Sequence, residues 1–212
     1  MKKSRLGLLQ THILDILTQD ELEKFEFKEL PKTSTIYTED IEIIILKTGS
    51  AKLSFFEDGE EFILYHLEKN NIAILDDNCV FEVLEDAQIY VIRLDNIGEI
   101  LHNQKAASEI LTTTLNTIIV QRQITKSILF EDAKGRIANF LIELANEQDL
   151  KQNGYQYVFL PFSLKVLSSF VGLKRQSAST AFNELIKDDI IRKITPHEFL
   201  IIDHEKLESY TN

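Results

Sequence analysis

The spacing of apolar residues divides the chain into a front half of short strands and a back half of helices. After a helical pattern over residues 8–25, alternating and β-branched runs follow one another. Turn signals separate several of these runs, notably at 48–50 and 57–60. Strands are therefore predicted over residues 35–37, 41–47, 51–56, 61–66, 72–75, 80–84 and 89–93. Short strands at this spacing predict a small β-barrel or roll, which we assign to residues 1–95.

A long helical pattern occupies residues 96–130. It contains no proline and only one glycine, Gly98, so a single helix is expected. A heptad stripe runs along it and comprises Leu101, Ser108, Leu111, Leu115, Ile118, Arg122, Thr125 and Leu129. Such a helix buries its stripe either against its own β-domain or against a second copy in a coiled coil. We expect the second arrangement, a homodimer whose interface contains Leu111, Leu115, Ile118, Arg122 and Thr125.

Residues 131–212 predict a C-terminal domain of helices and short strands. An Asn153-Gly154 turn follows its first helix, and two strand-like segments surrounding residues 195–198 are typical of a β-wing. The elements expected, apart from the pair of helices described next, are a helix over 132–148 and strands over 157–160, 190–194 and 199–203.

Within this domain, two helical patterns flank Gly172. Ser163 can cap the first, over 164–170, because its hydroxyl can accept an amide proton of the first turn. The second, over 174–187, has an apolar face and a polar face. The apolar face contains Ala178, Ala181, Phe182 and Leu185, and the polar face contains Arg175, Gln176, Ser179 and Thr180. This arrangement is typical of a helix-turn-helix, although a plain helical hairpin has the same pattern.

The polar face of the second helix suits the major groove of DNA. Arginine can bond bidentately to guanine and glutamine to adenine, while serine and threonine can reach bases or phosphates. The net charge of −11 argues against a polyanion as partner, but the first 160 residues carry all of it, with 16 basic and 27 acidic residues. Residues 163–183 contain Lys165, Lys174 and Arg175 and no acid. Lys165 lies on the supporting helix, where it can reach only phosphate.

Two segments resemble the Crp/Fnr family of bacterial transcription regulators. EDAKGRIANFLIELA, residues 131–145, is similar to the helix that opens the family's DNA-binding domain, and LSSFVGLKRQSAS, residues 167–179, resembles its helix-turn-helix. Residues 43–56 and 62–67 look like its β-roll. The resemblance implies an α+β chain with a β-roll sensor, a long dimerisation helix and a winged helix-turn-helix. It also implies an inverted-repeat operator in double-stranded DNA, with RNA polymerase as a further candidate partner.

The resemblance assigns roles to residues at the turn. Bases would be read by Arg175, Gln176, Ser179 and Thr180, and phosphates would be bound by Lys174 and Ser177 together with Lys165. The sequence departs from the family where Lys174 replaces a frequent Ser or Thr, Gln176 a frequent Glu, and Thr180 a frequent Arg. Because Glu accepts from cytosine whereas Gln pairs best with adenine, the operator sequence should differ from the usual family site.

The front half lacks the residues with which family members hold a cyclic nucleotide. Those members use a Gly-Glu turn followed by an Arg-Ser or Arg-Thr pair, whereas residues 70–83 read NNIAILDDNCVFEV. This stretch contains no Arg and no Gly, and its Asp76, Asp77 and Glu82 would repel a phosphate. The effector is therefore expected not to be a cyclic nucleotide.

Other cofactors and activities find little support. An iron-sulfur cluster needs about four thiolates, and the chain has one, Cys79, which is more simply a small buried residue than a redox switch. A haem ligand could come from His12, His66 or His102, each of which is more often an ordinary histidine. His197 and His204, beside the wing, are most simply solvated. No phosphate loop, zinc-binding helix or nucleophile elbow is present, so no enzyme is expected.

The sequence also predicts where the protein acts. The first 17 residues lack the uninterrupted apolar core of a signal peptide, and no stretch is apolar enough to span a bilayer. A single cysteine fits a reducing compartment, so a cytoplasmic protein without a membrane partner is expected. The alternative function is a ligand-binding β-roll module that acts through protein partners rather than through DNA.

Overall fold

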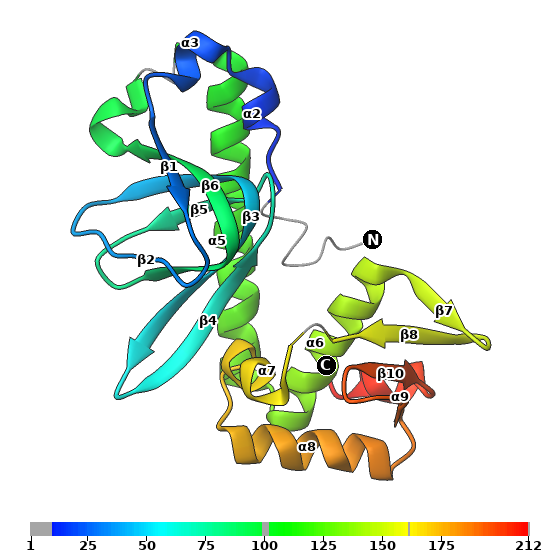
Figure 1. Cartoon of the computed structure of the whole chain (residues 1–212). Helices are drawn as coiled ribbons and strands as arrows, with labels where there is room; N and C mark the ends of the chain where they lie inside the picture. The colour runs from blue at the N-terminus through cyan, green and yellow to red at the C-terminus, as the bar shows by residue number, and fades with distance from the viewer. Residues whose placement is uncertain (1–9, 99–101, 161, 212) are drawn as a thin grey trace. The chain divides into compact units, whose positions relative to one another are not determined.

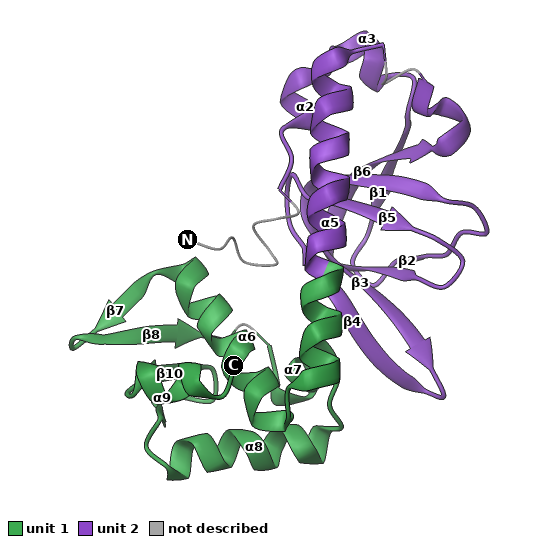
Figure 2. Ribbon diagram, turned by 180° about the vertical axis from the view of Figure 1, so that it is seen from behind, with its two compact units in different colours: residues 1–4, 121–212 green, residues 5–120 purple. Residues whose placement is uncertain are grey.

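The computed structural model of the chain divides into two compact units, shown in Figures 1 and 2. One comprises residues 5–120 and the other residues 1–4 and 121–212. Within the described part of the chain, no helix has the length and apolar character needed to cross a membrane. The residues described are 10–98, 102–160 and 162–211, so Leu101 of the expected heptad stripe and the first residues of the helix expected over 8–25 lie outside them.

The unit of residues 5–120 contains a six-stranded antiparallel sheet, which confirms the expected β-roll (Figure 1). The longest strand, β3, pairs with β4, β5 and β6, and β6 also pairs with β1 and β2. The strands are β1 (Glu26–Leu30), β2 (Thr35–Ile36), β3 (Glu42–Glu57), β4 (Glu60–Leu67), β5 (Ile72–Leu75) and β6 (Val80–Arg93). Strand β1 was not predicted.

Strands β3 and β6 each replace two expected strands. The turn expected at 48–50 is wrong, because the chain does not reverse there: β3 continues, with shifts in its register to β6 between Leu46 and Ala51. Gly49 has a φ of +86° in this bulge, and a Cβ there would lie 2.4 Å from the Asp86 carbonyl oxygen. A glycine that permits a bulge gives the same local signal as a glycine that permits a turn. The turn at 57–60 does reverse the chain, between β3 and β4.

The helix expected over 8–25 is instead two short helices, α2 (Ile13–Ile16) and α3 (Gln19–Leu22). Leu17 between them is extended, and Thr18 starts the second helix with a capping box. In that box the Thr18 hydroxyl accepts from the Glu21 amide, and the Glu21 carboxylate accepts from the Thr18 amide at 2.8 Å. The apolar spacing is helical as expected, and the capping box at Thr18 divides it into two helices.

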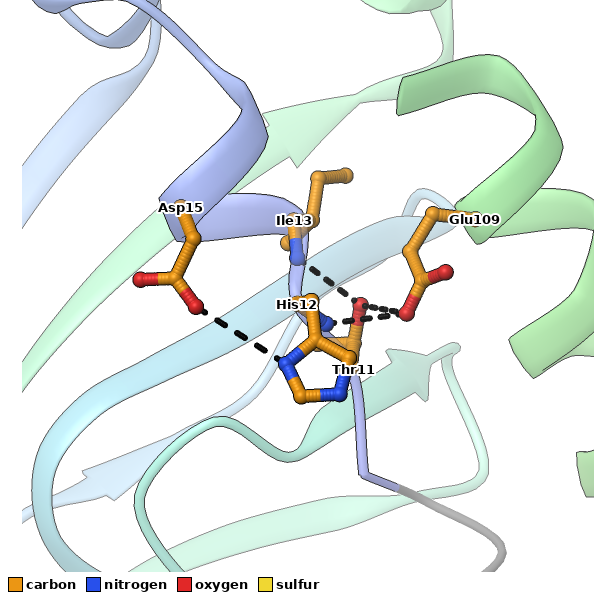
Figure 3. Close-up of polar contacts among 5 residues, drawn as sticks. All are labelled: Thr11, His12, Ile13, Asp15 and Glu109. Atoms are coloured by element: carbon orange, nitrogen blue, oxygen red, sulfur yellow. Dashed lines mark hydrogen bonds and ion pairs between the residues drawn. The ribbon is translucent and has the colours of Figure 1, made fainter. Parts of the chain in front are cut away.

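Glu109 of the long helix α5 (Gln104–Phe130) anchors the segment before α2, as Figure 3 shows. Its Oε1 accepts from the Thr11 hydroxyl at 3.2 Å and from the His12 amide at 2.8 Å. The Thr11 oxygen in turn accepts from the Ile13 amide at 3.2 Å. This segment is therefore tied by side-chain hydrogen bonds to the helix that packs on the roll.

Helix α5 begins at Gln104, eight residues after the expected start, and runs to Phe130 as expected. The Asn103 side chain accepts from the Ala106 amide at 3.2 Å and so caps the helix. A short 3-10 turn, η1 (Leu94–Asn96), occupies the position of the expected start, and residues 99–101 lie outside the described residues. Ala106 and Ile110 join a core cluster with residues of α2 and of the sheet, among them Ile13, Ile43, Ile45, Tyr90 and Ile92.

Two stripes with the same heptad spacing run along α5. The chain itself buries one of them, which comprises Ala106, Ile110, Thr113, Thr117, Val120, Ile124 and Ser127. The stripe expected from the sequence is a different one and is exposed: Ser108, Leu111, Leu115, Ile118, Arg122, Thr125 and Leu129. At about 100° per residue, the two stripes lie on nearly opposite sides of the helix.

The described residues between 131 and 211 form the expected helices and wing (Figure 2). Their buried side chains make one apolar core. A four-stranded antiparallel sheet has the order β7-β8-β10-β9. The elements are α6 (Ala133–Gln148), β7 (Leu150–Gln152), β8 (Tyr155–Phe159), α7 (Leu164–Phe170), α8 (Arg175–Lys187), β9 (Ile191–Lys193), β10 (Glu198–Ile201) and α9 (His204–Ser209). Strand β7 and helix α9 were not predicted; the turn at Asn153-Gly154 joins β7 to β8.

Candidate DNA-binding surface

The turn between α7 and α8 has the geometry of a helix-turn-helix. The Ser163 hydroxyl caps α7 as expected, accepting from the Val166 amide at 3.4 Å. After α7, Gly172 takes a left-handed φ of +61°, which residues with a side chain rarely adopt. The Leu173 amide then donates to the Ser168 carbonyl at 2.9 Å and closes the turn. Gly172 is therefore the residue that lets the chain pass directly from one helix into the next.

Helix α8 is held to the unit by the apolar face that the sequence predicts. Ala178, Ala181, Phe182 and Leu185 are at most 5% exposed and belong to the core cluster. The ring of Phe182 meets that of Phe199 on β10 edge-on, with centroids 5.0 Å apart. Because the buried face is continuous, the opposite face of α8 is fixed toward the outside.

The residues expected to read bases lie on that outward side. Arg175, Gln176 and Thr180 are exposed and Ser179 is half-buried. The residues expected to bind phosphate, Lys165, Lys174 and Ser177, are exposed as well. Lys174 occupies the N-cap position of α8, where its side chain makes no capping bond. The first-turn amides of α8 therefore lack the side-chain partner that a Ser or Thr would supply there, and they can donate to an anion.

A hollow of about 540 Å³ lies between the start of α6 and the outward side of α8. Its lining includes the cations Lys134 and Lys174, and the acids Asp132 and Glu184. The Lys134 ammonium contacts the Glu184 carboxylate at 2.7 Å, and this hydrogen bond raises the pKa of Lys134. The acidic side chain on α8 is thus paired with a cation. Gln176, Ser177 and Thr180 also line the hollow, so together with Lys174 four expected DNA contacts share one concave surface.

Arg136 on α6 joins the turn at Gly172 to the end of α5. The sequence did not predict it as a site residue. Its Nη1 donates to the Gly172 carbonyl at 3.0 Å, and its Nη2 to the Ile128 carbonyl at 2.8 Å. Its Nε donates to the Glu131 carbonyl at 3.1 Å. The acceptors lie up to 36 residues away in sequence, so no local pattern could have indicated them. Arg136 therefore helps to position the helix-turn-helix.

The wing consists of β9 and β10, which pair antiparallel. Arg192 and Asp189 form an exposed ion pair at its base, with 3.0 Å between Nη2 and Oδ1. His197, expected to be simply solvated, has its Nδ1 3.0 Å from the Leu160 carbonyl oxygen. His197 is exposed, as expected, and its ring in addition ties the wing to the residue that follows β8. His204 lies 3.6 Å from Glu208.

In the β-roll, residues 70–83 form β5, a loop and the start of β6. Asp76 accepts from the Asn78 amide at 3.0 Å within the loop. Burial and a hydrogen bond to Asp76 raise the pKa of the Cys79 thiol to about 12, so Cys79 stays protonated at neutral pH. Glu82 is not an isolated charge, because Lys52 lies 3.1 Å from it. The expected repulsion of a phosphate therefore rests on Asp76 and Asp77 more than on Glu82.

Lys52 is the centre of a polar cluster on the roll. Its ammonium also contacts Glu61 at 2.6 Å, and Glu61 accepts from the buried Ser54 hydroxyl at 3.0 Å. Burial opposes the charge on Lys52, but hydrogen bonds to Glu61 and Glu82 outweigh it and raise its pKa. The cluster is thus a structural salt-bridge network joining β3, β4 and β6.

The three histidines considered as haem ligands lie in different environments. His12 is exposed and 3.7 Å from Asp15, and His102 is exposed. His66 on β4 is half-buried, and burial lowers its pKa. Among the described residues, no three His, Cys, Asp or Glu side chains gather as a metal site would require.

The chain resembles known proteins in both sequence and structure. Residues 135–210 match the sequence pattern of the Crp-like helix-turn-helix domain. No curated protein was found to match the chain in sequence.

Three solved structures illustrate the structural likeness. A mutant of CooA from Carboxydothermus hydrogenoformans is 20% identical, with a TM-score of 0.85 and 96% of each chain covered. FixK2 from Bradyrhizobium japonicum is 16% identical, with a TM-score of 0.68, over 89% of this chain and 98% of that one. A protein from Eubacterium rectale, described as a regulator of the Crp/Fnr family, is 15% identical, with a TM-score of 0.66, over 94% and 97%.

At these identities the structures establish the fold, which is a β-roll, a long helix and a winged helix-turn-helix. The matched sequence pattern identifies the C-terminal unit independently. Residues 135–210 therefore form a Crp-like helix-turn-helix domain, and the chain as a whole has the fold of CooA, FixK2 and the Eubacterium rectale protein.

Proposed function

We propose that two copies of the chain bind an inverted-repeat operator and read it with α8. The observation that carries this proposal is the outward side of α8, where Arg175, Gln176 and Thr180 are exposed while the opposite face is buried. These side chains can bond to base edges, and no acid interrupts the first nine residues of the helix. Ser179, which is half-buried, would contact a base only at close approach.

Phosphate contacts would surround this reading face. Lys174 and Ser177 line the hollow beside the start of α8, and Lys165 is exposed on α7. Together with the uncapped amides of α8, they would form a surface that attracts the DNA backbone. The acidic front half of the chain offers no such surface. Phosphate contacts position the helix on the DNA, and base contacts determine which DNA sequence is recognised.

The second copy would pair through α5. Leu111 is 61% exposed, Leu115 52% and Ile118 41%, on the side of the helix opposite its buried stripe. Arg122 and Thr125 continue the stripe. A row of exposed leucine and isoleucine at heptad spacing is stabilised by a parallel copy of itself, so this stripe would be the dimer interface.

The proposal divides the chain into a sensor over residues 1–95, a segment over 96–130 that contains the dimerisation helix α5, and a DNA-binding domain over 131–212. The effector would not be a cyclic nucleotide, because residues 70–83 offer no cation to its phosphate. Such a regulator acts in the cytoplasm, where bacterial DNA lies, on the access of RNA polymerase to a promoter. It carries out no catalytic step.

Selection of the full-length protein on random duplexes tests the proposal. A two-fold dimer should select an inverted repeat whose half-site centres are about 34 Å apart, one turn of DNA. Light scattering on the complex should show two chains per duplex. Selection of no sequence, with binding to all duplexes alike, would favour the alternative function, in which the β-roll acts through protein partners.

A further inference from the structure

The exposed side of α8 extends beyond the residues discussed so far. Asn183 and Lys187 are exposed and follow Gln176 and Thr180 along the helix. At roughly 100° per residue, Asn183 projects within about 20° of Gln176. The buried residues Ala178 and Leu185 point to the other side. Asn183 therefore lies near the middle of the outward face, closer to it than Arg175, which lies toward its edge.

The residues between Gln176 and Asn183 allow a close approach to DNA. The outward positions in this interval are Ser179 and Thr180, whose side chains are short. Between Gln176 and Asn183, no long side chain on the outward face would hold the third turn of α8 away from the base edges. The acid next to Asn183, Glu184, is paired with Lys134 at 2.7 Å, so its charge is partly compensated near the phosphates.

Helix stability does not account for an asparagine at this position. Asparagine is a weak helix former, and at exposed positions in the interior of a helix it costs stability relative to alanine. Among the described residues, the Asn183 side chain has no hydrogen-bond partner of its own chain, so its amide remains available. Asparagine can bond bidentately to the N6 and N7 atoms of adenine.

We propose that Asn183 is a further specificity-determining residue, which reads one adenine in each half-site. The proposal rests on the proposed function, because it requires α8 to lie in the major groove. Asn183 lies seven positions after Gln176, which is about 10 Å along the helix. Its base pair therefore lies about three base pairs from the one that Gln176 contacts.

Base-preference profiles of full-length variants test this inference. The wild-type protein first selects its operator, and every base pair of that operator is then replaced in turn. Asn183→Ala should lose discrimination, by about five- to hundredfold, at one position per half-site. Asn183→Asp should move the preference at that position toward cytosine, because a carboxylate can only accept. Asn146→Ala, a change to another exposed asparagine on α6, is the control and should leave the profile unchanged.

The outcomes separate this inference from the proposed function. If the wild type selects an operator but Asn183→Ala keeps every preference, Asn183 is only a solvated surface residue and the inference is overturned. If the wild type selects no sequence, the proposed function itself fails. Thermal unfolding checks the fold of each variant, and Asn183→Ala should melt no lower than the wild type, since alanine is the better helix former.

Discussion

Arg136 donates from Nη1 to the carbonyl oxygen of Gly172 at 3.0 Å, which ties α6 to the turn of the helix-turn-helix. The same guanidinium serves Ile128, in the last turn of α5, and Glu131, just after it. The last carbonyls of a helix have no partner inside that helix, so Arg136 supplies one. Its planar fork reaches acceptors in several directions, which a lysine ammonium on a flexible stem does not reproduce.

The first prediction is that Arg136→Lys destabilises the C-terminal unit by about 1–2 kcal/mol, because the variant cannot donate to at least two of these carbonyls while the charge is kept. Urea unfolding followed by circular dichroism measures the effect. Arg192→Lys is the matched control: it alters an exposed ion pair and should cost no more than about 0.5 kcal/mol. Equal stability of the two variants would show that the Arg136 hydrogen bonds are not needed.

The second prediction concerns the dimer. Replacing Leu115 and Ile118 by Glu should leave monomers, since four carboxylates would face one another in the proposed interface of α5. Light scattering reports the mass. Thr112→Glu, at an exposed position to one side of the stripe, is the control and should remain dimeric. A double variant that still dimerises would place the interface elsewhere.

The third prediction is that cyclic AMP does not bind. The stretch 70–83 contains Asp76 and Asp77 and no arginine or lysine to neutralise a phosphate. Titration calorimetry should give no binding heat up to millimolar nucleotide. Saturable binding in the micromolar range would contradict our interpretation of this stretch.

The fourth prediction is that Cys79 reacts slowly in the folded protein. Its pKa is raised to about 12 by burial and by Asp76, so almost no thiolate is present at pH 8.5. Iodoacetamide should modify the native protein at least about tenfold more slowly than the urea-unfolded chain.

The raised pKa of Cys79 also makes the stability of the fold depend on pH. The raised pKa favours folding below the pKa of the unfolded thiol, near 9, and this contribution disappears as the pH rises toward 12. Equal rates of modification in the native and unfolded protein would contradict a half-buried thiol that stays protonated.

Local sequence patterns predict the helix-turn-helix, but they do not predict the long-range hydrogen bonds that hold it in place. The cap at Ser163, the turn at Gly172 and the two faces of α8 all depend on residues within a few positions of one another, and the structure confirms them. The hydrogen bonds of Arg136 with Gly172 and of His197 with Leu160 join residues 36 and 37 positions apart. Such partners depend on tertiary packing, which a single sequence does not contain.

In the front half, the errors have a different origin. Gly49 lies in a bulge and not in a turn. Glycine permits the backbone conformation of either, so only the pairing of β3 with β6 distinguishes them. On α5, two heptad stripes exist and the sequence shows both. Which one the chain covers itself is decided by the sheet residues that pack against Ala106 and Ile110.

The central claim is that α8 reads base edges, and the pair Arg175→Ala and Lys165→Ala tests it most directly. Fluorescence anisotropy compares the selected operator with a scrambled duplex over a salt series. Arg175→Ala should cost about 1–3 kcal/mol for each bidentate bond to a base that it removes from the operator complex, and much less on the scrambled duplex. Lys165→Ala should weaken both duplexes alike and lower the salt slope by about one unit for each phosphate that the dimer no longer binds. If Arg175→Ala instead weakens both duplexes equally, Arg175 binds phosphate and the assignment of the reading face is contradicted.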